Sequence, residues 1–442
     1  MYYMGLSGAI QEMYDGDPSI LRAADLADLL QYPVSKEAQA VVGILMTETI
    51  QWQFDNGIKK RNPKADVVER MRSTIAALLG DLLVAALNEE AEGFCRRPSD
   101  KASFKTTLAE SRLYEALKRD WADLGYIEVA IGFRGSQSWE NGEVLYSGNR
   151  SSRWVTRLRA TAKLLGLLEE HGITPQGAGN HFRRNLDKSV PIVLKADKKG
   201  PLKGKRMPVP QSPKADQLAA EVTEINRFLA EYSLSIGPAP YLYRSYNNGD
   251  TEEFDWNLGG RFYAPEGSYL YWPSQKRLQM EIEGSSVVEI DITACQLTIL
   301  HALMGVELDL STDPFQIDGL DRSRAKKIFN VIVGMGGVPS DNPNGPLTNK
   351  WADEHQLLCS KFPVLKEIQA KGWNSLKLQV LDADIMRDTL LTLFREHQAP
   401  ALPVHDCLIV RKQDADLAEE VFGQAFEDRL GVRPMFTRES LG

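Results

Sequence analysis

Two aspartates, Asp291 and Asp406, stand at the ends of apolar runs, where their carboxylates predict a site for a hard divalent cation. In LPVHDCLIVRK (402–412) the pair His405–Asp406 interrupts a run typical of a buried hairpin. In SSVVEIDITACQLTILHAL (285–303) a β-type run ends near Asp291, and the pattern then becomes helical. A carboxylate among apolar side chains needs a positive partner. Mg²⁺ (or Mn²⁺) suits this role, because it takes few carboxylates and completes its coordination with phosphates and water.

A third segment supplies cations at helical spacing. In DRSRAKKIFNVIVG (321–334), Arg322 and Lys326 are four residues apart and share one face of the expected helix. Next to a metal site they suit a triphosphate, because arginine binds it as a fork and lysine as a point charge. Two metal ions about 4 Å apart can activate a hydroxyl and stabilise a phosphate leaving group. Two plainer readings remain: structural aspartates at turns and a solvated basic helix face.

The order of these segments resembles motifs A, B and C of family A DNA polymerases and of the single-subunit RNA polymerases of phage and mitochondrial type. EIDITACQL is similar to motif A, RSRAKKIFNVIVG to motif B and PVHDCLIV to motif C. LQVLDADIMRDTLL (378–391) is similar to the family A segment that lines the primer–template, and DWNLGGRFYAP (255–265) to the Gly-Arg-x-Tyr element of the RNA polymerases. The resemblance covers roughly residues 250–442.

The resemblance implies a role for each matching residue. Asp291 and Asp406 would be the catalytic metal ligands. Four residues would contact the incoming nucleotide: Arg322, Lys326, Gln296 and Asn330. Five would contact primer or template: Gln379, His405, Arg261, Tyr263 and Arg277. The implied cofactor is Mg²⁺ or Mn²⁺, and the implied partners are a DNA template, a primer or nascent strand, and NTP or dNTP.

Departures from the family pattern bear on the sugar of the nucleotide. Gln296 stands where family A DNA polymerases carry a Glu that excludes the ribose 2′-hydroxyl, and Cys407 replaces the Glu after the motif C His-Asp. Gly334 falls on the position of the motif B tyrosine. Because that tyrosine helps to select the sugar, Gly334 weakens any inference about sugar selectivity. Gln296, Cys407 and the Gly-Arg-Phe-Tyr element favour RNA or primer synthesis slightly, whereas the segment from Gln379 to Asp384 favours a DNA polymerase.

The expected fold is α+β: a right-hand polymerase palm with reduced fingers after a mainly helical region. Residues 1–195 are expected to form that helical DNA-binding region, 196–216 a basic Pro-rich linker, and 217–442 the palm and fingers. A helix ending near Gly125, a strand, and a second helix in RWVTRLRATAKLLGLLEEHGI (153–173) leave a winged-helix module, a thumb and a generic helical domain open. Asp382 and Asp384 are expected at the start of a helix, where carboxylates are favoured.

Composition limits the remaining alternatives. The chain has 442 residues, is 43% hydrophobic and 25% charged, and carries a net charge of −8, which argues weakly against nucleic-acid binding by the whole surface. Between His181 and Arg206, however, the sequence has nine Lys or Arg and only two Asp. Such a basic segment suits either binding to a phosphate backbone or a solvated linker. Four dispersed cysteines and no long apolar run predict a cytoplasmic protein with no membrane partner.

Rivals to a polymerase are a DNA-binding replication initiator with a degenerate palm and a metal-dependent nuclease. The intact pair of aspartates argues against the first. The second usually needs three or more clustered acidic residues. The sequence leaves open whether the setting is phage or plasmid replication, repair or defence, and whether synthesis needs a primer.

Overall fold

The chain is a mixed α+β structure that divides into two compact units. The computed structural model describes residues 17–132, 136–140, 143–147, 155–265, 268–338 and 349–441. Unit 1 comprises residues 1–189, 229–241 and 264–284, and unit 2 comprises 190–228, 242–263 and 285–442. Each unit is therefore assembled from segments that are distant in sequence. Among the described residues, no helix has the length and apolar character needed to cross a membrane.

Unit 1 is built on helices packed around an apolar core. Its helices are α1 (Pro18–Arg22), α2 (Lys36–Asp55), α3 (Ala65–Ala85), α4 (Ser111–Asp123), α5 (Ala162–Glu170), α6 (Ala178–His181) and α8 (Ser274–Arg277). Its strands are β1 (Asp25–Leu26), β2 (Gln31–Pro33), β3 (Cys95–Arg96), β4 (Ile127–Ala130), β5 (Ser136–Glu140), β6 (Glu143–Ser147), β7 (Arg157–Ala160), β8 (Phe182–Arg184) and β13 (Glu281–Ile282). The buried side chains of α2, α3 and α4 form one cluster that includes Leu45, Leu79 and Trp121.

One helix of unit 1 is shorter than the sequence pattern predicts. Residues 153–173 suggest a single helix, but Arg157–Ala160 form β7, which lies between β3 and β4 in the order β1-β3-β7-β4. Thr161 then caps α5 by accepting a hydrogen bond from the Leu164 N–H. The order α3, β3, α4, β4, β7 is compatible with a winged helix. Because residues 133–135, 141–142 and 148–154 of the β4–β7 connection lie outside the described residues, that interpretation stays a prediction.

Unit 2 contains two sheets and seven helices among its described residues. The strands are β9 (Ile192–Lys195), β10 (Arg206–Met207), β11 (Tyr243–Tyr246), β12 (Gly259–Tyr263), β14 (Ser285–Ile292), β15 (Ala401–Val404), β16 (Cys407–Arg411) and β17 (Phe436–Ser440). The helices are α7 (Pro213–Leu229), α9 (Cys295–Met304), α10 (Arg322–Met335), α11 (Asn349–Lys361), α12 (Val364–Lys371), α13 (Ser375–His397) and α14 (Ala415–Leu430). One sheet has the order β10-β9-β11-β12, and in the other β14 lies between β16 and β17.

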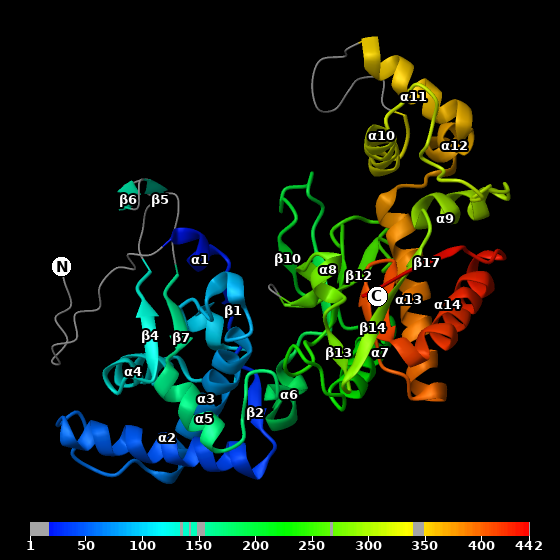
Figure 1. Cartoon of the computed structure of the whole chain (residues 1–442). Coiled ribbons are helices and arrows are strands. Elements are labelled where there is room, and N and C mark those ends of the chain that lie inside the picture. Colours follow the sequence, from blue (N-terminus) through cyan, green and yellow to red (C-terminus); the bar gives the residue numbers. More distant parts are fainter. Residues whose placement is uncertain are drawn as a thin grey trace. The chain divides into compact units, whose positions relative to one another are not determined.

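The long helix α13 connects the parts of unit 2. It packs against β12, α9, α14 and α10. Helices α11 and α12 pack against α10 and against each other, and the three gather at one end of α13 (Figure 1). The residue before the helix, Asn374, is its N-cap, and its side chain accepts hydrogen bonds from the N–H groups of Leu376 and Lys377. Asp382 and Asp384 are therefore in the helix interior. The expectation that they start a helix is wrong, because the asparagine cap lies eight residues before Asp382.

Candidate functional site

Asp291 and Asp406 lie at the same end of two paired strands. In the antiparallel pair β14–β16, Asp291 is directly opposite Cys407, the residue that follows Asp406. Asp406 belongs to the two-residue turn joining β15 and β16, and its carbonyl accepts a hydrogen bond of 3.4 Å from the Ile292 N–H. The ladder register thus brings together two carboxylates that are more than a hundred positions apart in the sequence.

The turn that carries Asp406 is tight and its first residue is in an unusual conformation. His405 has a φ of 59°, in the left-handed region, where histidine is one of the few non-glycine residues found with some frequency. Its ring contacts that of Tyr263 edge-on, with centroids 5.9 Å apart and planes inclined at 71°. Strained residues held by surrounding contacts often cluster at functional sites. His405 and Tyr263, both predicted to contact primer or template, are therefore neighbours beside Asp406.

The two carboxylates repel each other. The pKa of Asp291 is raised to about 7, first by desolvation from the surrounding protein and then by the charges of Asp406 and Glu289, whereas Lys326 opposes the shift. An excess of negative charge of this kind is what a divalent cation neutralises, and Mg²⁺ needs only one or two carboxylates when phosphates supply further oxygens. The described residues hold no cluster of three or more His, Cys, Asp or Glu side chains that could bind a metal by themselves. The donor set thus fits a metal shared with a substrate.

The raised pKa makes a prediction for the stability of the metal-free protein. The folded state holds a proton on Asp291 above the usual carboxyl range, so the stability contributed by this group declines between pH 4 and pH 7. Asp291→Asn lacks that decline and should gain stability relative to wild type over this range, by on the order of 1 kcal/mol after solvent screening of an exposed side chain. Urea unfolding in EDTA at several pH values checks this. Asp416→Asn, at an exposed surface ion pair, is the control, and a difference independent of pH would contradict the prediction.

Arg261 is the protein cation nearest to Asp406 in the described site. Its Nη2 lies 3.9 Å from Asp406 Oδ1, while its Nε donates to both carboxylate oxygens of Asp382 at 3.0 and 3.1 Å. Burial disfavours the charged guanidinium, but Asp382 and then Asp406 raise the pKa of Arg261 above its ordinary value. Arg261 therefore remains charged and lies between Asp382 of α13 and the β15–β16 turn that carries Asp406. The sequence resemblance points to Arg261, but not to Asp382 as its partner.

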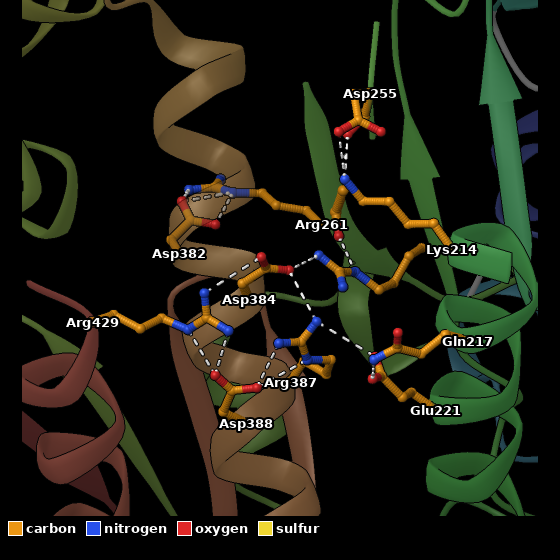
Figure 2. Close-up of polar contacts among 12 residues, drawn as sticks. Lys214, Gln217, Glu221, Asp255, Arg261, Asp382, Asp384, Arg387, Asp388 and Arg429 are labelled. Atoms are coloured by element: carbon orange, nitrogen blue, oxygen red, sulfur yellow. Dashed lines mark hydrogen bonds and ion pairs between the residues drawn. The ribbon is translucent and has the colours of Figure 1, made fainter. Parts of the chain in front are cut away.

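Further ion pairs fix the position of α13, and sequence reasoning missed them. Figure 2 shows Asp382, Asp384 and Asp388 along α13, each facing arginine side chains. Asp384 Oδ1 accepts from the fully buried Arg244 at 2.7 Å. Two arginines, Arg387 and Arg429, bridge Asp384 and Asp388. The only local signal is the Asp-x-Asp-x-x-Arg-Asp spacing, which does not reveal partners on β11 and α14.

The exposed face of α10 carries three of the four residues predicted to bind nucleotide. Arg322, Lys326 and Asn330 recur every four residues and are exposed, while the opposite face of the helix is buried through residues such as Ile328 and Ile332. Arg322 is paired with Asp313. The Lys326 ammonium lies 5.7 Å from the Phe315 ring centroid and makes no ion pair among the described residues. The charge of Lys326 also lowers the pKa of Asp291, as the smallest of the contributions to its shift.

The remaining predicted residues are divided between the units. Gln296 lies in the first turn of α9, five residues after Asp291. Gln379 is half-buried on α13, one turn before Asp382. Arg277 belongs to unit 1, where its Nη1 donates to the Trp272 carbonyl at 2.6 Å. The other ten predicted residues all belong to unit 2, and the roles of all eleven residues stay predictions.

Comparison with known proteins finds similarity among solved structures alone. No protein-family model and no curated protein matches the sequence. Among solved structures, the chain is similar to the POL domain of Pol1 from M. smegmatis in complex with DNA primer-template and dNTP, with a TM-score of 0.32 and 14% identity. The similarity covers 51% of this chain and 50% of that chain, so the chain spans about half the length of the protein it matches. The chemistry of the site therefore rests on its own residues.

Proposed function

We propose that the protein is a templated nucleotidyltransferase that extends a nucleic-acid strand on a DNA template. The observation that carries the proposal is the placement of Asp291 and Asp406 at the same end of paired strands, where the charge of Asp406 helps to raise the pKa of Asp291 and that of Lys326 opposes the rise. A carboxylate pair of this kind suits the two-metal chemistry of phosphoryl transfer. The sequence resemblance to polymerase motifs A, B and C supports the same reaction.

Each group has a defined task in this reaction. Bound Mg²⁺ would neutralise the phosphates and activate the attacking 3′-hydroxyl. Asp291 and Asp406 would hold the metal, and Arg261, whose Nη2 lies 3.9 Å from Asp406 Oδ1, would orient the Asp406 carboxylate. Lys326 and Arg322 bind the triphosphate of the incoming nucleotide, for which Arg322 must exchange Asp313 for phosphate. His405 and Tyr263 contact the strand end. Catalysis comes mainly from positioning and charge neutralisation.

The sugar of the nucleotide is assigned to ribose, with deoxyribose as the alternative. Gln296, at the start of α9 after the strand that carries Asp291, replaces the Glu that excludes the 2′-hydroxyl in family A DNA polymerases. Gln is neutral and can accept or donate a hydrogen bond, so it imposes less of a barrier. A fold-level analogy does not decide between RNA and DNA synthesis.

The deciding experiment is extension of a labelled primer on a short DNA template with Mg²⁺, with NTP and dNTP in separate reactions and a third reaction without primer. Product that depends on metal, template and nucleotide supports the proposal. The preferred pool identifies the sugar, and unprimed product identifies a primase or RNA polymerase. Absence of product with either Mg²⁺ or Mn²⁺, on both the primed and the unprimed DNA template, would overturn the catalytic proposal in favour of a DNA-binding protein.

Lys326→Ala is expected to raise the KM for the nucleotide about 10- to 100-fold, because a charged hydrogen bond to phosphate is worth about 1.5–3 kcal/mol. The kcat should change less, since the carboxylate pair stays in place. Steady-state extension at varied nucleotide concentration measures both constants. Lys327→Ala is the matched control, because Lys327 is also exposed on α10 but points about 100° away around the helix. Equal effects of the two substitutions would contradict the assignment.

A further inference from the structure

The β9–β10 hairpin of unit 2 (residues 192–207) is an ordered, strongly basic element. Its turn is closed by hydrogen bonds from the Ala196 N–H to the Lys205 carbonyl at 2.9 Å and from the Gly204 N–H to the Asp197 carbonyl at 3.0 Å. Asp250 anchors it, because the Asp197 N–H donates to Asp250 Oδ1 at 2.6 Å. The backbone of the basic segment around residue 200 is thus an ordered hairpin that presents its lysines on the surface.

The cations of this hairpin make no ion pair among the described residues, although the carboxylates of Asp197 and Asp250 lie at its turn. Lys195 on β9 is directly opposite Arg206 on β10, and like charges facing each other across a strand pair are unfavourable. The pKa of Lys195 is lowered, first by burial and then by the neighbouring charges of Arg206 and Lys198. Four more lysines are exposed on the turn and after it: Lys198, Lys199, Lys203 and Lys205. None of these four, nor Lys195 or Arg206, makes an ion pair among the described residues. Because the chain as a whole has a net charge of −8, this hairpin is a local positive surface, which suits an anionic ligand.

A row of aromatic rings connects the hairpin to the catalytic turn. The Lys195 ammonium lies 5.9 Å from the centroid of the Tyr263 ring. Tyr263 stacks on Tyr243, its cross-strand partner, at 5.8 Å and 25°, and its other neighbour is His405. Tyr243, Tyr263 and His405 are all half-buried, so each ring keeps part of its surface accessible. Cations and aromatic rings in one row are the elements with which proteins bind single-stranded nucleic acid.

We propose that the β9–β10 hairpin binds the phosphate backbone of a single strand of nucleic acid whose bases stack on Tyr243 and Tyr263 and which continues to the turn carrying Asp406. This inference rests on the proposed function, because it takes that turn as the place of strand extension. A single strand is favoured over a duplex because only unpaired bases present their faces to tyrosine rings. Binding is independent of sequence, since phosphates and stacked rings supply the contacts.

The first test is binding of a fluorescent oligothymidylate of about 20 nucleotides, measured by anisotropy in EDTA so that no metal-dependent reaction takes part. The variant K198E/K203E/K205E should bind at least about 10-fold more weakly, and the slope of log affinity against log salt should fall by about 2, since each lost contact to a single strand removes about 0.7. The control K366E/K371E/K412E makes the same change in net charge at exposed lysines of α12 and after β16. Equal losses in the two variants would overturn the proposal.

A second variant tests the stacking separately. Tyr243→Ala should weaken oligothymidylate binding about 5- to 100-fold without changing the salt slope, because a stacked base contributes about 1–3 kcal/mol and no charge. A duplex of equal length should compete poorly for the wild-type protein. Unchanged affinity of Tyr243→Ala, or a duplex that competes as well as the single strand, would contradict the single-strand assignment and leave a general anion-binding hairpin.

The two proposals fail in different ways. If the wild-type protein extends no primer but K198E/K203E/K205E loses oligothymidylate binding, the polymerase proposal is overturned, and of the hairpin proposal the binding of a single strand stands without a role in strand extension. If the protein extends primers and this variant binds and extends like wild type, only the hairpin proposal is overturned. If both hold, the variant should need about 10-fold more template for half-maximal extension, with a kcat close to wild type at saturating template.

Discussion

Asp291→Asn and Asp406→Asn are each expected to lower the rate of nucleotide incorporation at least about 10³-fold, which corresponds to about 4 kcal/mol of transition-state stabilisation. Asparagine keeps the shape of the side chain but removes the negative charge that holds a divalent cation. Because Asp291 at the end of β14 and Asp406 in the adjacent β15–β16 turn are proposed to hold the same metal, the loss of either should remove the function of both. Single-turnover primer extension at saturating nucleotide and Mg²⁺ measures the effect.

The combination of both substitutions separates a shared site from two independent effects. Residues that act as a unit give non-additive losses, so the double variant should be about as inactive as either single variant. Asp416→Asn serves as the control, because Asp416 is an exposed carboxylate paired with Arg438 at the surface of unit 2. All variants should bind oligothymidylate in EDTA like wild type. A single variant that retains more than about a tenth of the wild-type rate would exclude its aspartate from the catalytic centre.

Local pattern was enough to predict where the carboxylates and cations would be. The apolar runs on either side of His405–Asp406 indicate a hairpin, and in the structure these two residues are the turn between β15 and β16. The change from strand to helix after Asp291 appears as β14 followed by α9. The four-residue spacing of Arg322 and Lys326 puts both on one exposed face of α10. Each of these signals depends on neighbours within a few residues.

The partners that position those groups were not predictable in this way. Asp382 contacts Arg261 across 121 residues, and Asp384 contacts Arg244 across 140. A single sequence does not indicate which of many carboxylates meets which arginine, and the general preference of carboxylates for helix starts led to the wrong location for Asp382. The same applies to the basic segment near residue 200, where clustered Lys, Gly and Pro suggest a linker, but long-range hydrogen bonds to residues 249 and 250 make it part of a hairpin.

Arg261→Met is expected to destabilise unit 2 by about 3–5 kcal/mol, because it leaves a buried carboxylate without its counter-charge. The Asp382 side chain is 1% exposed, and both of its carboxylate oxygens accept hydrogen bonds from the Arg261 guanidinium. The double variant R261M/D382L replaces the ion pair by apolar side chains of similar volume and should recover most of the lost stability, since such replacements of buried pairs are often neutral or stabilising. Urea unfolding of the wild type and the two variants measures this.

Activity of R261M/D382L then distinguishes a structural arginine from a positioning residue. Arg261 also lies 3.9 Å from Asp406 and is its nearest protein cation in the described site. Without it, Asp406 loses the group that fixes its orientation, so the double variant should fold like wild type but show a kcat lowered about 10- to 100-fold with a smaller change in nucleotide KM, which corresponds to about 1.4–2.8 kcal/mol. Added Mn²⁺ should not restore the rate fully, because the lost element is the orientation of the ligand. Full activity in the refolded double variant would confine Arg261 to holding α13 against β12.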